Sequence, residues 1–118
     1  MEGGIAATER FLALSPLPTA IICSNDMTAI GVLRAAYHQG LQVPRDVSVI
    51  GLDDIDFAEF TLPPLTTIRL SRTDLAKAAF EALRQQAENA DGSSIQREFL
   101  VSTSLVLRGS TAPPPLGI

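Results

Sequence analysis

The fold is decided by residues 18–54, which read PTAIICSNDMTAIGVLRAAYHQGLQVPRDVSVIGLDD. The stretch begins with an apolar run at residues 20–24, which has the length and composition of a strand buried on both faces. Residues 25–39 then repeat apolar side chains at helical spacing, and Gly40 stands where a left-handed residue ends a helix. A second β-rich run follows at residues 47–52. This order predicts two parallel strands joined by a right-handed crossover through a helix.

The flanking segments extend the same alternation. Residues 2–14 carry apolar side chains at helical spacing, which predicts a helix before the first strand. Residues 66–70 are typical of a third strand, and an S-x-x-D capping box at residues 71–74 starts a long helix that ends near Asn89. Two short extended segments are expected to follow: residues 95–101 and residues 105–108. The predicted fold class is therefore α/β, a partial open parallel sheet with helices on both faces.

Composition excludes several classes of protein. The 118 residues allow one small domain, and the 9 basic and 13 acidic side chains give a net charge of -4, which is unsuited to gripping a phosphate backbone. A single cysteine, Cys23, and a single histidine, His38, exclude an internal disulfide and the usual zinc clusters. We expect no metal and no cofactor. The longest uncharged stretch, residues 11–25, is too short to span a bilayer, and no leader is visible, so we expect a cytoplasmic protein without membrane contact.

Polar residues follow the first two predicted strands. Asn25 and Asp26 come after the first strand, and Asp53 and Asp54 come after the second. Ligands of open α/β sheets bind beyond the carboxyl ends of the strands, so Asn25 and Asp53 share a crevice if the strands are neighbours. An amide both donates and accepts hydrogen bonds, whereas a carboxylate accepts them, which suits a ligand with many hydroxyl groups. Carboxylates repel phosphate, and the chain has no phosphate-binding glycine motif.

Other interpretations of these residues remain open. Asn25 and Asp26 could serve only as helix caps, and the acidic residues of 53–59 could form a solvated turn. Paired carboxylates also occur in Mg²⁺ sites and in glycosidases. However, no second catalytic carboxylate follows a separate strand, and no lysine is placed to face a phosphate. We therefore expect no enzymatic activity, although Asp53 and Asp54 are the residues that would have to supply it.

Two further motifs complete a family resemblance. PPLTTIRL at residues 63–70 and LVLRGST at residues 105–111 join the stretch quoted above. Together the three resemble the effector-binding region of the lactose/galactose repressor family, over nearly the whole chain from Gly3 to Thr111. Members of that family are bacterial transcription regulators with an N-terminal helix-turn-helix and a core similar to periplasmic sugar-binding proteins of type I. Two α/β subdomains of that core hold a small effector, often a sugar, in the cleft between them.

The resemblance implies roles for particular residues. Residues 1–112 would form the later part of the second subdomain and residues 113–118 a proline-rich tail, with the DNA-binding domain and the first subdomain outside this chain. Asn25 and Asp53 would contact effector hydroxyls, and Asp26, the third ligand-site residue, would support the same loop. The residues expected at a dimer interface are Ile30, Leu33, Phe57, Phe60 and Leu62.

The function expected from this resemblance is an effector-binding and dimerising module of a transcriptional repressor. Its partners would be a sugar or sugar derivative and a second copy of the chain, in a homodimer or a larger self-association, with DNA contacted only through the N-terminal domain. The alternative from another class is a fragment of a sugar-binding receptor of a transport system, which shares the fold. A sugar-processing enzyme is the third possibility.

Overall fold

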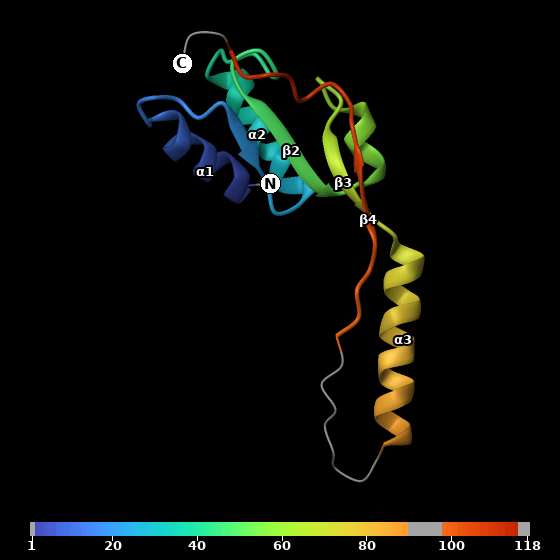
Figure 1. Cartoon of the computed structure of the whole chain (residues 1–118). Helices are drawn as coiled ribbons and strands as arrows, with labels where there is room; N and C mark the ends of the chain where they lie inside the picture. The colour runs from blue at the N-terminus through green and yellow to red at the C-terminus, as the bar shows by residue number, and fades with distance from the viewer. Residues whose placement is uncertain (1, 90–97, 116–118) are drawn as a thin grey trace. The chain divides into compact units, whose positions relative to one another are not determined.

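The computed structural model describes residues 2–89 and 98–115. Helices and strands alternate along the chain (Figure 1), and in order they are α1 (Glu2–Leu12), β1 (Ala20–Ile22), α2 (Asp26–His38), β2 (Ser48–Asp53), the 3-10 helix η1 (Asp56–Phe60), β3 (Thr66–Leu70), α3 (Arg72–Glu88) and β4 (Thr103–Val106). The chain divides into two compact units. The first contains residues 1–69 and 105–118, and the second contains residues 70–104.

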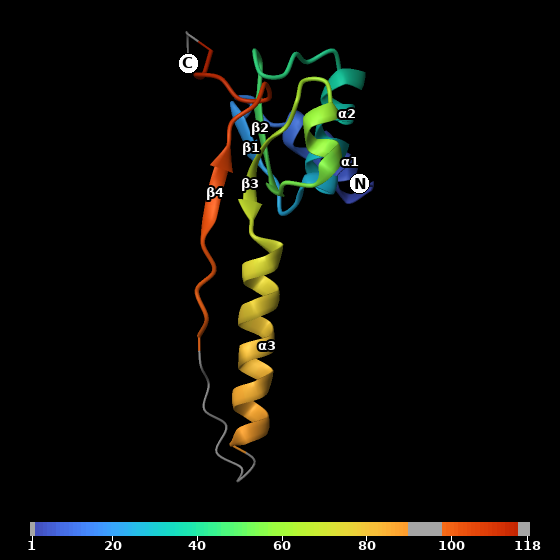
Figure 2. The same cartoon turned by 90° about the vertical axis from the view of Figure 1, so that its right-hand side faces the viewer.

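The four strands form one sheet in the order β1-β2-β3-β4. β1 and β2 pair in parallel with Ile22 opposite Ile50, and β2 and β3 pair in parallel with Ile50 opposite Thr66. These pairings confirm the α/β class and the predicted parallel arrangement of the first three strands. The strand β4 runs opposite to β3 (Figure 2), so the sheet is mixed rather than wholly parallel. The α1 and α2 helices lie on the same side of the sheet (Figure 2).

Local signals in the sequence explain where the helices begin and end. The Asn25 side chain accepts a hydrogen bond from the Thr28 N–H at 2.8 Å and caps α2. Gly40 has a φ of 74°, a left-handed conformation that glycine adopts without strain, and the chain turns there into the next loop. The Ser71 hydroxyl accepts from the Asp74 N–H at 3.2 Å at the start of α3. All three features match the sequence prediction.

The core of the first unit lies between α2 and the sheet. Alternate residues of β2 are buried, as expected for a strand with one covered face. Gly4 of α1 approaches α2 so closely that a Cβ at this position would lie 2.4 Å from the Thr28 carbonyl oxygen, so only glycine fits there. The buried apolar side chains of the core are Ile21, Cys23, Ala29, Val32, Leu33, Val47, Val49, Ala58 and Leu65.

Other sequence predictions also differ from the structure. The strand expected to be buried on both faces, β1, has only its middle residue buried, and Ile22 is exposed. The 3-10 helix η1 was not expected, because five residues are too few to show a helical period. Of the two C-terminal extended segments, residues 98–101 form no strand, residues 95–97 lie outside the described residues, and the single strand β4 starts two residues earlier than residues 105–108 predicted. After β4, the Arg108 N–H bonds to the Thr66 hydroxyl and the Gly109 N–H to a proline carbonyl, so a regular ladder does not continue.

The second unit consists mainly of α3. Within α3, Arg84 pairs with Glu81 at 2.7 Å and with Glu88 one turn later, which stabilises the exposed helix only slightly. None of the residues of α3 is buried. The large apolar side chains of this helix are therefore exposed, and they include Leu75, Phe80 and Leu83.

Candidate functional site

Asn25 and Asp53 belong to the carboxyl ends of two adjacent strands. In the register of β1 and β2, Ile22 pairs with Ile50. Asp53 is the last residue of β2 and Asn25 follows three residues after the end of β1, so both belong to the same edge of the sheet. Neighbouring strands are about 4.8 Å apart. The structure therefore brings together the two strand ends that the sequence predicted to share a crevice.

The two side chains keep hydrogen-bonding groups available at this edge. The Oδ1 atom of Asn25 is occupied by the cap bond to Thr28, so the helix-cap interpretation is correct for that atom. Its Nδ2 group makes no hydrogen bond within the described residues, and neither does the exposed carboxylate of Asp53. The edge thus offers two N–H donors from Asn25 and two acceptor oxygens from Asp53. This combination suits a ligand that has both hydroxyl donors and ring or hydroxyl acceptors.

Asp26 is a supporting residue and does not face solvent. Its side chain is fully buried, and its Oδ1 atom accepts from the Thr67 hydroxyl at 2.5 Å. Its Oδ2 atom accepts from the Ile55 N–H at 2.9 Å. A direct bond from Asp26 to a ligand does not fit this geometry, because both oxygens are used inside the protein. Support of the loop after β2, the role that the family resemblance implies, does fit.

Asp54 is held by two arginines. Its Oδ1 accepts from Arg108 Nη2 at 2.7 Å and its Oδ2 accepts from Arg69 Nε at 2.6 Å, and only 9% of the side chain is exposed. Burial alone would raise the pKa of Asp54, but the hydrogen bonds from Arg108 and Arg69 hold it below its ordinary value of 3.8. A carboxyl group fixed in this way is unsuited to act with Asp53 as a catalytic acid–base pair. Among the residues described, no three His, Cys, Asp or Glu side chains are grouped as they would be around a metal ion.

Three of the five predicted interface residues, Ile30 of α2 and Phe57 and Phe60 of η1, line one shallow groove of about 400 Å³. Phe57 and Phe60 are exposed by 72% and 74%, and Leu62, which is not among the lining residues of the groove, is exposed by 92%. Leu33 differs, since it is 7% exposed and packs in the core between α2 and the sheet. We call the surface around the groove the α2–η1 patch, and its members are Met27, Ile30, Phe57, Phe60 and Thr61.

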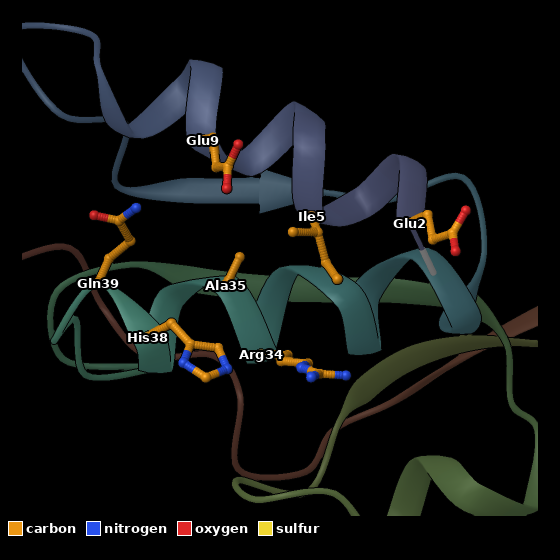
Figure 3. Close-up of a pocket in the computed structure, with 7 residues that line it drawn as sticks. All are labelled: Glu2, Ile5, Glu9, Arg34, Ala35, His38 and Gln39. Atoms are coloured by element: carbon orange, nitrogen blue, oxygen red, sulfur yellow. The ribbon is translucent and has the colours of Figure 1, made fainter.

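A separate groove of about 510 Å³ lies between α1 and α2 (Figure 3). Glu2 and Glu9 reach it from α1, and Arg34 and His38 from α2. None of the predicted ligand residues lines this groove.

No helix in the described part of the chain is both long and apolar enough to cross a membrane.

Sequence reasoning missed the residues that hold the site in place. Thr67 binds Asp26 across 41 positions, and Arg108 binds Asp54 across 54 positions. Thr67 and Arg108 each lie in a motif that supported the family resemblance, but a motif does not say which side chains meet. Arg69 directly follows the TTI sequence of β3, and its position on a strand next to β2 is the only signal that could have suggested its contact with Asp54.

Comparison with known proteins identifies the family. The periplasmic binding protein-like domain matches residues 2–111. The repressor CytR of Escherichia coli is 40% identical over 114 residues, which cover 97% of this chain and 33% of CytR. The regulator MalR of Streptomyces coelicolor is 41% identical over 115 residues, which cover 98% of this chain and 32% of MalR. The chain therefore spans about a third of the length of these curated relatives.

Solved structures agree with the sequence comparison. A LacI transcriptional regulator from Bacillus cereus subsp. cytotoxis has a TM-score of 0.84 at 32% identity, covering 94% of this chain and 39% of that one. The lac repressor dimer, bound to operator and the anti-inducer ONPF, has a TM-score of 0.77 at 34% identity, covering 92% and 37%. A sucrose-bound LacI-family regulator from Lactobacillus casei has a TM-score of 0.71 at 28% identity, covering 93% and 40%.

These relatives are transcriptional regulators, which favours the repressor interpretation over the transport receptor and the enzyme. The chain belongs to the periplasmic binding protein-like domain family, in the form found in regulators of the lactose/galactose repressor type.

Proposed function

We propose that this chain is the effector-binding and dimerising part of a transcriptional repressor, and that its effector is a sugar or sugar derivative. The single observation that carries the proposal is a pair of polar groups, Asn25 Nδ2 and the Asp53 carboxylate, which make no hydrogen bond among the described residues and belong to adjacent ends of parallel strands. A related regulator has been solved with sucrose bound, and another structure of it holds glucose. Effector binding would favour one of two conformations of the repressor and so change its affinity for DNA.

Asp53→Asn in the complete gene product tests the ligand role. Asparagine has nearly the same size as aspartate and, like aspartate, is enriched at positive φ, so it is the least disruptive replacement at a position with a φ of 119°. Loss of one charge-assisted hydrogen bond costs about 1.5–3 kcal/mol, which is about a ten- to hundredfold loss in affinity. Isothermal titration calorimetry with glucose, sucrose and ribose measures the affinity of wild type and variant.

Glu59→Gln is the matched control, since Glu59 is an exposed carboxylate of the same acidic segment that stands outside the proposed pair. It should leave affinity unchanged. Equal affinity of Asp53→Asn and wild type for every sugar that binds would remove the assignment.

The proposed partner at the α2–η1 patch is a second copy of the chain. Phe57 and Phe60 are largely exposed, and a fully buried aromatic side chain removes about 150–250 Å² from water. A stable interface buries about 800 Å² on each partner. The two phenylalanines would supply the apolar centre of such an interface. The lac repressor structure that this chain matches is a dimer, which supports the same occupant.

Sedimentation of Phe60→Asp tests the dimer proposal. A charge at the centre of an apolar interface should turn the dimer into a monomer at micromolar concentration. Gln42→Asp, which adds the same charge on an exposed loop residue, should remain dimeric. A monomeric wild-type protein, or a dimer that survives Phe60→Asp, would contradict the proposal.

A further inference from the structure

We infer that Asp54 is a positioning residue for Asp53: gripped by Arg108 and Arg69, it holds the turn that presents the Asp53 carboxylate to the ligand. The inference rests on the proposed function, because it concerns the same ligand edge. Its basis is a set of contacts around the turn at residues 53–55: the Asp54 carboxylate is paired with two arginines, and the Ile55 N–H donates to the buried Asp26 carboxylate.

The turn after β2 has a backbone that non-glycine residues adopt rarely. Asp53 has a φ of 119° and Asp54 a φ of 57°, so two successive aspartates are left-handed. Such residues are strained and persist only where surrounding contacts hold them. The contacts that can do so here are those of Asp54 and Ile55, together with the pairing of Asp53 opposite Arg69 at the end of β2.

Both of these residues are anchored to neighbouring elements. Asp54 is fixed by the two arginines, and the Ile55 N–H is fixed by the buried carboxylate of Asp26. Asp53 is the last residue of β2, opposite Arg69 of β3, and lies immediately before these two anchors; its own side chain makes no hydrogen bond in the described residues. The anchors therefore set the direction in which the Asp53 carboxylate points.

Arg69 lies on β3, Arg108 lies just after the end of β4, and the two arginines contribute unequally. Arg108 is 17% exposed and also donates from Nη1 to the Leu65 carbonyl at 2.9 Å, whereas Arg69 is 57% exposed. Ion pairs at exposed positions contribute little, and removal of one partner from a buried pair is costly. Changes at Arg108 should therefore disturb the turn more than changes at Arg69.

The test uses Asp54→Asn in the complete gene product with two separate measurements. Hydrogen exchange of the amides of residues 53–56 needs no ligand and should speed up at least tenfold. Affinity for glucose, sucrose and ribose, measured by titration at equal folded fraction, should fall at least tenfold. Asp46→Asn, which removes the exposed ion pair with Arg45, is the matched control and should change neither.

Conservative substitution separates positioning from simple stability. Arg108→Lys keeps the charge but loses the fork of donors, so it should restore part of the affinity and exchange protection that Arg108→Met loses. Arg69→Gln, at an exposed position where folding is not at risk, should shift both quantities about two- to fivefold.

The inference is overturned if Asp54→Asn and Arg108→Met leave both exchange and affinity at wild-type values. If Asp54→Asn fails to fold, wild-type exchange and affinity in both Arg69→Gln and Arg108→Lys would overturn it equally. If wild type binds none of the three sugars, the proposed effector class is wrong, while the exchange measurement still decides whether Asp54 holds the turn.

Discussion

Asp26→Ala should destabilise the protein more than any other single change at the strand edge. The substitution removes the acceptors of two hydrogen bonds, from Thr67 Oγ1 and from the Ile55 N–H. Hydrogen bonds to charged groups contribute about 1.5–3 kcal/mol each, and both donors would be left without this partner. Relief from burying a carboxylate offsets part of this, so we expect a loss of about 3 kcal/mol in the free energy of unfolding.

Urea unfolding at 25 °C, followed by circular dichroism, measures this loss. Asp26→Asn keeps one acceptor and should lose about 2 kcal/mol, which provides a second reading if the alanine variant does not fold. Thr67→Val removes the hydroxyl without a change in volume and should lose about 1–2 kcal/mol. The double variant Asp26→Ala with Thr67→Val should reveal a coupling of about 1 kcal/mol. A loss below about 0.5 kcal/mol for both Asp26 variants would show that the carboxyl does not hold the loop.

Three further predictions concern the same region. Gly51→Ala should lower the free energy of unfolding in urea by at least about 2 kcal/mol, because the added Cβ would lie 2.1 Å from Asp26 Oδ1. Gly3→Ala on α1 is the control: its Cβ meets nothing within 4 Å, so it should raise the free energy of unfolding by about 0.5–1 kcal/mol. Equal effects of the two substitutions would refute the close packing at Gly51. Burial and, secondarily, the charge of Asp26 raise the pKa of the Cys23 thiol from 9.0 to about 11. At pH 8 the folded protein should therefore react with a thiol reagent at least a hundredfold more slowly than the unfolded protein. Rapid labelling of the folded protein would contradict this prediction. The pKa of Asp54 is lower in the folded than in the unfolded protein, so the ionised side chain stabilises the fold fully above the ordinary pKa of 3.8, and this contribution is lost as the pH falls through the folded pKa. Below about pH 4, the free energy of unfolding of Asp54→Asn should therefore depend less steeply on pH than that of the wild type. Parallel curves for the two proteins would contradict this prediction.

Most elements could be predicted because they carry local signals. Thr66–Leu70 is the strand predicted from residues 66–70, and α3 starts at the predicted cap of Ser71. Asn25 caps α2 as its position before an apolar helix suggested. Such signals depend on residues within a few positions of one another, which a single sequence displays directly.

The rest depends on contacts between distant residues. Leu33 lies on a helix with two adjacent apolar stripes, and only the packing of α2 against the sheet decides that Leu33 is buried while Ile30 reaches the surface. The ion pair between Arg108 and Asp54 joins residues that are far apart in the sequence. The positive φ angles at Asp53 and Asp54 could not be predicted, because neither position carries the glycine that usually indicates such a turn. The strand edge that we propose as the ligand site was therefore predictable from the sequence, but the residues that hold it in place were not.

The most direct test of the central claim is a nuclear magnetic resonance titration of the complete gene product with glucose, sucrose and ribose. The signals to follow are the side-chain amide of Asn25 and the backbone amide of Asp53. If one ligand hydroxyl cluster bridges the two strand ends, both signals shift together and saturate at the same sugar concentration, while the side-chain amide of Gln42 stays in place. A sugar that binds and shifts only one of the two, or neither, would show that these residues do not share a ligand.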